Sequence, residues 1–82
     1  MAGHECRYAF YLRDLGAVLK ERAREARKQH DSGRTDFESG RLIAYYEVLS
    51  TMRNQADVFD LSAEDLNLHD IDPDRDLLSN AT

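Results

Sequence analysis

This 82-residue chain has one cysteine, one proline, no tryptophan and four glycines. Because Cys6 is alone, no disulfide can form within the chain, and a lone thiol suits a reducing compartment. The proline stands at position 73 and the glycines at positions 3, 16, 33 and 40, so little interrupts helices before the last quarter of the sequence. These scarcities exclude a disulfide scaffold and favour an all-α fold.

Long apolar runs are also missing, and none approaches the ~18 residues that a membrane span needs. The opening stretch MAGHECRYAF lacks the apolar segment of a signal peptide, and Ala2 rules out N-terminal myristoylation. We therefore expect a cytoplasmic protein with no membrane partner.

The net charge of -5 is unevenly distributed. Residues 1–59 contain ten Lys or Arg and nine Asp or Glu, whereas residues 60–82 contain one base, Arg75, and seven acids. The sequence therefore predicts a nearly neutral helical hairpin over residues 1–59 and an acidic tail over residues 60–82.

Two segments place apolar residues at spacings of three and four, the pattern of an amphipathic helix. The first helix is expected from about Glu5 to about Gln29, and its stripe comprises Tyr8, Leu12, Leu15, Leu19, Ala23 and Ala26. The second is expected from Asp36 to about Phe59, and its stripe comprises Leu42, Tyr45, Leu49, Met52, Ala56 and Phe59. Thr35 and Glu38 match a capping box, and Gly33 is a natural left-handed residue for leaving the first helix. Gly16 is costly inside a helix, which indicates either tolerance or the close approach of another helix.

The short connection favours an antiparallel hairpin, in which Tyr8 would lie opposite Phe59 and Ala26 opposite Leu42. The apolar arcs are wider than one partner helix can cover. We therefore predict that two copies form a four-helix bundle. The predicted dimer interface comprises Tyr11, Val18, Phe37, Ala44, Tyr45, Val48 and Met52. The competing solution is that the acidic tail folds back over the uncovered flanks.

In the acidic tail, Ser62 followed by Ala63 and two acids predicts an N-cap and a short helical turn, and Pro73 breaks any helix that reaches it. Two roles remain open. The tail either lies along the bundle or docks on a partner protein as a segment that orders on binding. The docking residues would be Leu66, Leu68, Ile71, Leu77 and Leu78. From the sequence we expect that removing residues 60–82 leaves a folded helical dimer, whereas an unfolded product would show that the tail belongs to the core.

Motifs for catalysis, phosphate binding or metal binding are absent from the sequence. The stretch DIDPDRD begins like a calcium loop, but Arg75 occupies the glycine position and Ala81 the position of the closing glutamate. His4, His30 and His69 are expected to be solvated. We predict a non-enzymatic protein with no catalytic residues, cofactor or metal.

A basic group late in the first helix comprises Lys20, Arg24, Arg27 and Lys28. It supports an alternative function, a nucleic-acid-associated regulator that contacts phosphates through these side chains. A further possibility is that the acidic tail lies near them. The main hypothesis is a small homodimeric module for protein–protein interaction or regulation, whose protein partner the sequence does not identify.

Overall fold

The computed structural model describes residues 3–78, and within that range the chain forms helices and no strand. Helix α1 spans Gly3–Ser32 and α2 spans Asp36–Val58, with residues 33–35 between them. A 3₁₀ turn, η1 (Ala63–Leu66), and a π-helical turn, η2 (Asp74–Leu78), follow in the acidic tail. The predicted all-α fold and helical hairpin are confirmed. None of the helices described is long and apolar enough to cross a membrane.

The ends of α2 are fixed by local hydrogen bonds. At its start the Thr35 hydroxyl accepts a hydrogen bond from the Glu38 N–H at 3.1 Å, which is one half of the predicted capping box. The Glu38 carboxylate does not make the reciprocal bond, because its Oε1 has no hydrogen-bond partner among the described residues. At its end Asp60 is left-handed, with φ of 59°, and the Leu61 N–H donates to the Ala56 carbonyl at 2.7 Å. This is the six-to-one bond of a Schellman motif, with Asp60 in the place usually taken by glycine.

The predicted end of α1 is wrong in two respects. Gly33 does not adopt a positive φ, so it is not a left-handed cap. The helix continues to Ser32, whose hydroxyl donates to the Lys28 carbonyl at 3.0 Å. As a result His30 lies within α1 and is only 5% exposed, rather than solvated in a loop.

The half of the hairpin next to the turn packs as the helical pattern predicts. Ala23 and Ala26 of α1 and Leu42 and Leu49 of α2 are buried. Ala26 and Leu42 each lie six residues from the end of their helix next to the turn, so a small side chain on α1 lies at the level of a large one on α2.

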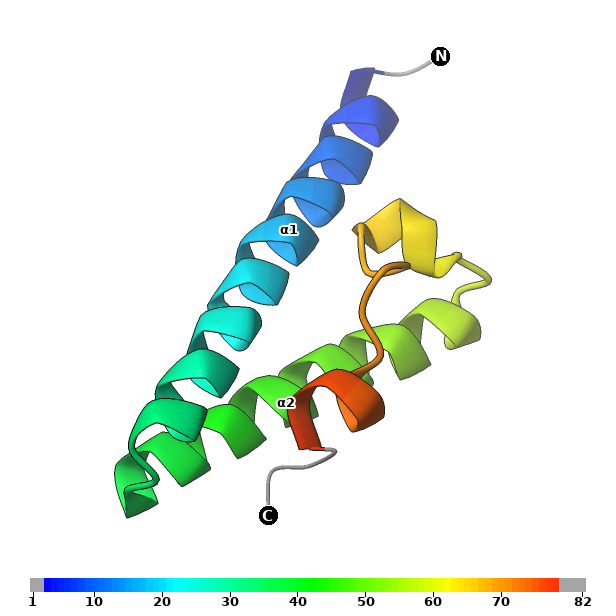
Figure 1. Ribbon diagram of the computed structural model, residues 1–82. Coiled ribbons are helices and arrows are strands. Elements are labelled where there is room, and N and C mark those ends of the chain that lie inside the picture. The colour runs from blue at the N-terminus through cyan, green and yellow to red at the C-terminus, as the bar shows by residue number, and fades with distance from the viewer. Residues whose placement is uncertain (1–2, 79–82) are drawn as a thin grey trace.

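Away from the turn the two helices diverge, and η1 lies between their far ends (Figure 1). The predicted pairing of Tyr8 with Phe59 does not bury this end, because these side chains are 65% and 69% exposed. The two helices diverge at this end because the acidic tail, rather than the facing helix, supplies the apolar side chains that pack there.

The acidic tail belongs to the core. It contributes four of the nine buried apolar side chains among the described residues, namely Leu66, Leu68, Ile71 and Leu77. Gly16 allows η1 to reach α1, since a Cβ at this position would overlap the carbonyl oxygen of Leu66. Close approach is therefore the reason for a glycine inside α1, although the approaching element is the tail backbone rather than α2.

Candidate interaction surface

The acidic tail lies along one side of the hairpin, and Lys20 of α1 holds its middle. Lys20 is 8% exposed, and its Nζ donates to the Asn67 carbonyl at 2.8 Å and to the Asp70 carboxylate at 2.7 Å. Arg24 adds a hydrogen bond to the Asp70 carbonyl at 3.1 Å. The hydrogen bond from Lys20 lowers the pKa of Asp70 below its ordinary value. The possibility that the tail lies near the basic group is confirmed.

Arg27, the third member of the predicted polyanion site, is also engaged within the chain. Its Nε donates to the Asp31 carboxylate at 2.9 Å, which lowers the pKa of Asp31, and its Nη1 donates to the Asp76 carbonyl at 3.4 Å. Lys28 is exposed on the same helix. Three of the four predicted phosphate-binding side chains, Lys20, Arg24 and Arg27, are therefore engaged within the chain itself.

Helix α2 holds the other edge of the acidic tail. The Tyr46 hydroxyl donates to the Asp74 carboxylate at 2.8 Å, and Arg53 donates to the Ile71 carbonyl at 3.1 Å. The bond to Asp74 raises the pKa of the Tyr46 hydroxyl, because loss of its proton would place two negative charges together. These contacts show that Tyr46 and Arg53 face the tail.

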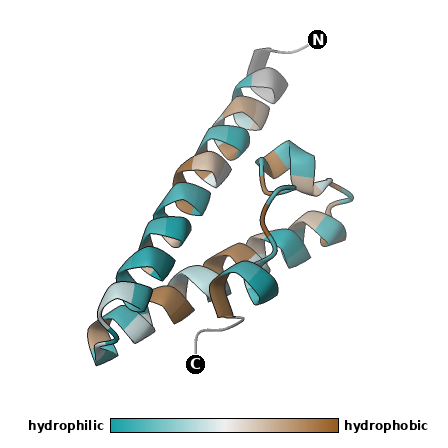
Figure 2. Cartoon of the chain, viewed as in Figure 1, coloured by the Kyte–Doolittle hydropathy of each residue, from teal (hydrophilic) through white to brown (hydrophobic). Residues whose placement is uncertain are grey.

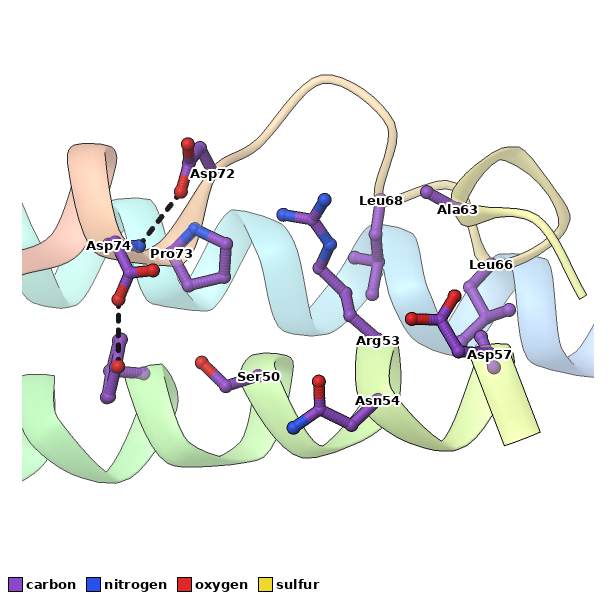
Figure 3. A pocket seen from close by; sticks show the side chains of 12 residues that line it. Ser50, Arg53, Asn54, Asp57, Ala63, Leu66, Leu68, Asp72, Pro73 and Asp74 are labelled. Carbon is purple, nitrogen blue, oxygen red and sulfur yellow. Dashed lines mark hydrogen bonds between the residues drawn. The ribbon is translucent and has the colours of Figure 1, made fainter.

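A cleft of about 490 Å³ remains between α2 and the acidic tail. In Figure 3, Arg53 extends from α2 toward the tail, while Ser50 and Asn54 lie along the helix below it. Sequence reasoning missed this cleft, because its walls come from segments that are far apart in the chain. Two of its polar groups, Tyr46 and Arg53, donate the hydrogen bonds to Asp74 and Ile71 that attach the tail to α2.

The carboxylates of the calcium-like stretch are used locally. Asp72 accepts hydrogen bonds from the N–H groups of Asp74 and Arg75 at 3.1 and 3.3 Å. Asp76 accepts from the Asp72 N–H at 2.9 Å and from the Arg75 guanidinium at 2.9 Å. In the part of the chain that the structure describes, no group of three or more acidic, histidine or cysteine side chains is placed to hold a metal ion.

The opposite side of α1 is not covered by the acidic tail. Successive helical residues are turned by about 100°, so Val18 points about 160° away from Lys20, and Tyr11 lies two turns further along on the same side as Val18. Tyr11 is 64% exposed and Val18 41%. The side of α1 that faces away from the tail is thus apolar and open to solvent.

Helix α2 shows the same division. Val48 points about 160° away from Tyr46, and Phe37 and Ala44 lie on its side of the helix. Phe37 is 74% exposed, Val48 is 42% exposed and Ala44 is exposed. Met52 is partly buried at the edge of the core and, with Val48 and Ala44, lines a shallow depression. Tyr45 is also partly buried, and the guanidinium of Arg41 lies 5.7 Å from its ring centre.

Both helices turn these uncovered flanks to the side opposite the acidic tail. We name this side the open face, and it comprises Tyr11, Val18, Phe37, Ala44, Val48 and Met52. Hydropathy differs along the helices, since α1 is hydrophilic near the turn whereas apolar residues lie along its upper half and along α2 (Figure 2). The competing idea that the tail shelters these flanks is wrong within this chain.

The predicted docking residues of the tail have a different environment. Leu66, Leu68, Ile71 and Leu77 are buried against the hairpin, and Leu78 is 36% exposed. Binding a partner through the four buried side chains would require the tail to leave its own core. The tail therefore lies along the hairpin, the first of the two roles left open by the sequence.

Comparison of the chain with family models, with curated proteins and with solved structures gives no match.

Proposed function

We propose that this chain is a non-enzymatic protein–protein interaction module that binds a second copy of itself through the open face, as a homodimeric four-helix bundle. The observation that supports it is the arrangement of the two sides of the hairpin. The acidic tail closes one side, while large apolar side chains on the other remain 41–74% exposed at Tyr11, Val18, Phe37 and Val48. Contiguous apolar patches of more than a few hundred Å² mark interaction sites on soluble proteins.

The dimensions of the open face fit a small interface. The Cα atoms extend over 49 × 19 × 17 Å. From Phe37 to the level of Tyr11 the open face is about 30 Å long, and near the turn two adjacent helices make it about 18 Å wide. Each copy would therefore bury about 500–600 Å². Two copies would bury about 1,100 Å², near the lower limit for specific interfaces, so we expect a dissociation constant in the micromolar range.

A second copy is the occupant that this surface suits best. Its apolar centre is bordered by charges of both signs, Arg22 and Glu25 on α1 and Arg41 and Glu47 on α2. Two-fold symmetry uses one patch twice, so a surface with both charge signs can match itself. In a larger assembly or a regulatory role, the dimer would be the form that acts.

The test is sedimentation equilibrium of the full chain between about 1 and about 100 µM, with two matched variants. Val48→Asp places a charge in the open face, so we expect the dimer to weaken at least about tenfold. Ile43→Asp is the control, because Ile43 is 49% exposed on the same helix but points about 140° away from Val48. A wild-type chain that remains monomeric throughout, or equal weakening by both variants, would contradict the proposal.

A further inference from the structure

Two arrangements can bring two copies of the open face together. A two-fold axis along the hairpin places both turns at the same end and lays α1 of each copy on α2 of the other. An axis across the hairpin places the turns at opposite ends and lays each helix on its own counterpart. The following inference rests on the proposed function, and it concerns which arrangement the residues favour.

On α1, apolar and charged residues lie at different distances from the turn. On α1 the stripe that faces away from the tail has the exposed Tyr11 and Val18 and the half-buried Leu15 in the half remote from the turn, followed by Arg22 and Glu25 near the turn. Their spacings of four, three, four and three keep them on one side of the helix. The stripe on α1 is thus apolar far from the turn and charged close to it.

The levels of these residues match those on α2 when the turns share one end. With a rise of about 1.5 Å per residue, Val18 lies about 21 Å from the end of α1, and Val48 lies about 18 Å from the start of α2. Leu15 and Met52 lie at about 26 and about 24 Å. Valine would therefore pack on valine, and leucine on methionine, across the interface.

Charges complement each other in the same arrangement. Glu25 lies about 11 Å and Arg41 about 8 Å from the turn, so an acid on one copy would meet a base on the other. The two-fold axis would create this ion pair twice. Within its own chain the Arg41 guanidinium lies 3.7 Å from the Glu38 carboxylate and 5.7 Å from the Tyr45 ring centre.

The opposite arrangement matches poorly. If the two Val48 side chains met at the axis, Leu15 of one copy would face the level of Glu25 of the other, and Tyr11 would face Gln29. Apolar side chains would then cover charged or polar ones, which costs free energy unless the polar groups find partners.

The divergence of the helices supports the same choice. The hairpin opens as a V away from its turn (Figure 1). Two such hairpins with their turns at one end open in the same direction, so each α1 follows the partner's α2 along its length. With turns at opposite ends, the helices would cross and lose contact toward their ends.

We infer that two copies associate with their turns at the same end, with α1 of each copy packed on α2 of the other and with ion pairs between Glu25 and Arg41. The interface then has two equal halves, each formed by different helices. In such an arrangement Val18 of one copy lies near Val48 of the other, whereas the two Val48 side chains are separated by the diagonal of the bundle.

Disulfide trapping distinguishes the arrangements. In a Cys6→Ser background, one isotope-labelled chain carries Val18→Cys and an unlabelled chain carries Val48→Cys. After mixing and oxidation with oxidised glutathione, we expect covalent dimers that contain one chain of each kind, and few from either chain alone. Efficient trapping of the Val48→Cys chain with itself would overturn the inference, because it requires turns at opposite ends.

A charge exchange provides a second readout. Glu25→Arg and Arg41→Glu should each weaken the dimer about threefold to tenfold, since each variant places like charges together twice. A mixture of the two variants restores opposite charges at both contacts and should associate about as tightly as the wild type. If the wild type dimerises but neither the trapping nor the mixture behaves in this way, the inference fails and the proposed function stands. If the wild type does not dimerise, both fail.

Discussion

Gly16 is the residue at which one added methyl group should do the most damage. In an exposed helix, replacing glycine by alanine stabilises a protein by about 1 kcal/mol. At this position a Cβ would overlap the Leu66 carbonyl oxygen and lie 2.9 Å from the carbonyl carbon of Leu66. Carbon atoms in ordinary contact are separated by about 3.5 Å or more, so η1 would have to move by at least ~0.6 Å, and its oxygen by more.

The cost of that movement follows from what η1 holds in place. Leu66 is 5% exposed and Leu68 fully buried, and the next carbonyl after Leu66, that of Asn67, accepts from Lys20. Partial exposure of one leucine costs about 1.5–3 kcal/mol, and weakening a hydrogen bond to a charged group costs about 1.5–3 kcal/mol. After subtracting the helical gain, we expect Gly16→Ala to reduce the free energy of unfolding by about 2–5 kcal/mol. For a domain of this size that lowers Tm by about 8–40 °C.

Thermal unfolding followed by circular dichroism, at one fixed protein concentration, is the assay. Gly40→Ala is the matched control, because Gly40 also lies within a helix but a Cβ there would meet no atom within 4 Å. We expect the control to raise Tm slightly. An unchanged or raised Tm for Gly16→Ala would refute the packing of η1 on α1.

Three further perturbations test other parts of the fold. Removing residues 60–82 takes away four buried side chains, so we expect loss of cooperative thermal unfolding; a stable, cooperatively folded hairpin would contradict this. Asp60→Gly relieves a left-handed residue at the end of α2 and should raise the free energy of unfolding in urea by about 0.5–1 kcal/mol, whereas a decrease would argue against the Schellman motif. Lys20→Met should destabilise the fold most at neutral pH. The folded-state pKa of Asp70 is lowered by Lys20, so this contribution is complete above the unfolded value of about 3.9 and disappears as the pH falls through the folded-state pKa. Urea unfolding of both proteins between pH 7 and pH 2 should show their difference shrinking below about pH 4, and a difference independent of pH would exclude this pairing.

Local signals in the sequence predicted the helices well. The start of α2 depends on Thr35 and Glu38, which are three residues apart, so the sequence contains all the information that the cap requires. The predicted end of α1 was wrong because Gly33 was assigned a left-handed conformation. In the structure α1 ends without a left-handed residue at this position. Because α1 extends beyond Gln29, His30 lies within the helix, and its side chain is buried rather than solvated.

The position of the acidic tail depends on contacts that sequence periodicity does not reveal. Its leucines follow neither the strand nor the helix repeat, and Lys20 reaches Asn67 across 47 positions of the chain. Gly16 was the available signal, since it indicated close approach, but it could not identify which element approaches. The cleft beside Arg53 had no signal in the sequence, because its polar groups come together only when the tail folds onto α2.

The open face was predicted more successfully, because the width of an apolar arc is a property of one helix at a time. The sequence placed Tyr11, Val18, Phe37 and Val48 outside the hairpin core, and all four are exposed in the single chain. Their contact with a second copy remains the proposal, since burial within one chain does not report on association.

Methyl chemical shifts measured while the full chain is diluted test that proposal most directly, because valine and isoleucine lie both on and off the open face. We predict that the methyl signals of Val18 and Val48 move together with concentration across the micromolar range, while those of Ile43 and Val58, which are exposed elsewhere on α2, stay fixed. Shifts that do not depend on concentration, or that move at Ile43 and Val58 instead, would contradict association through the open face.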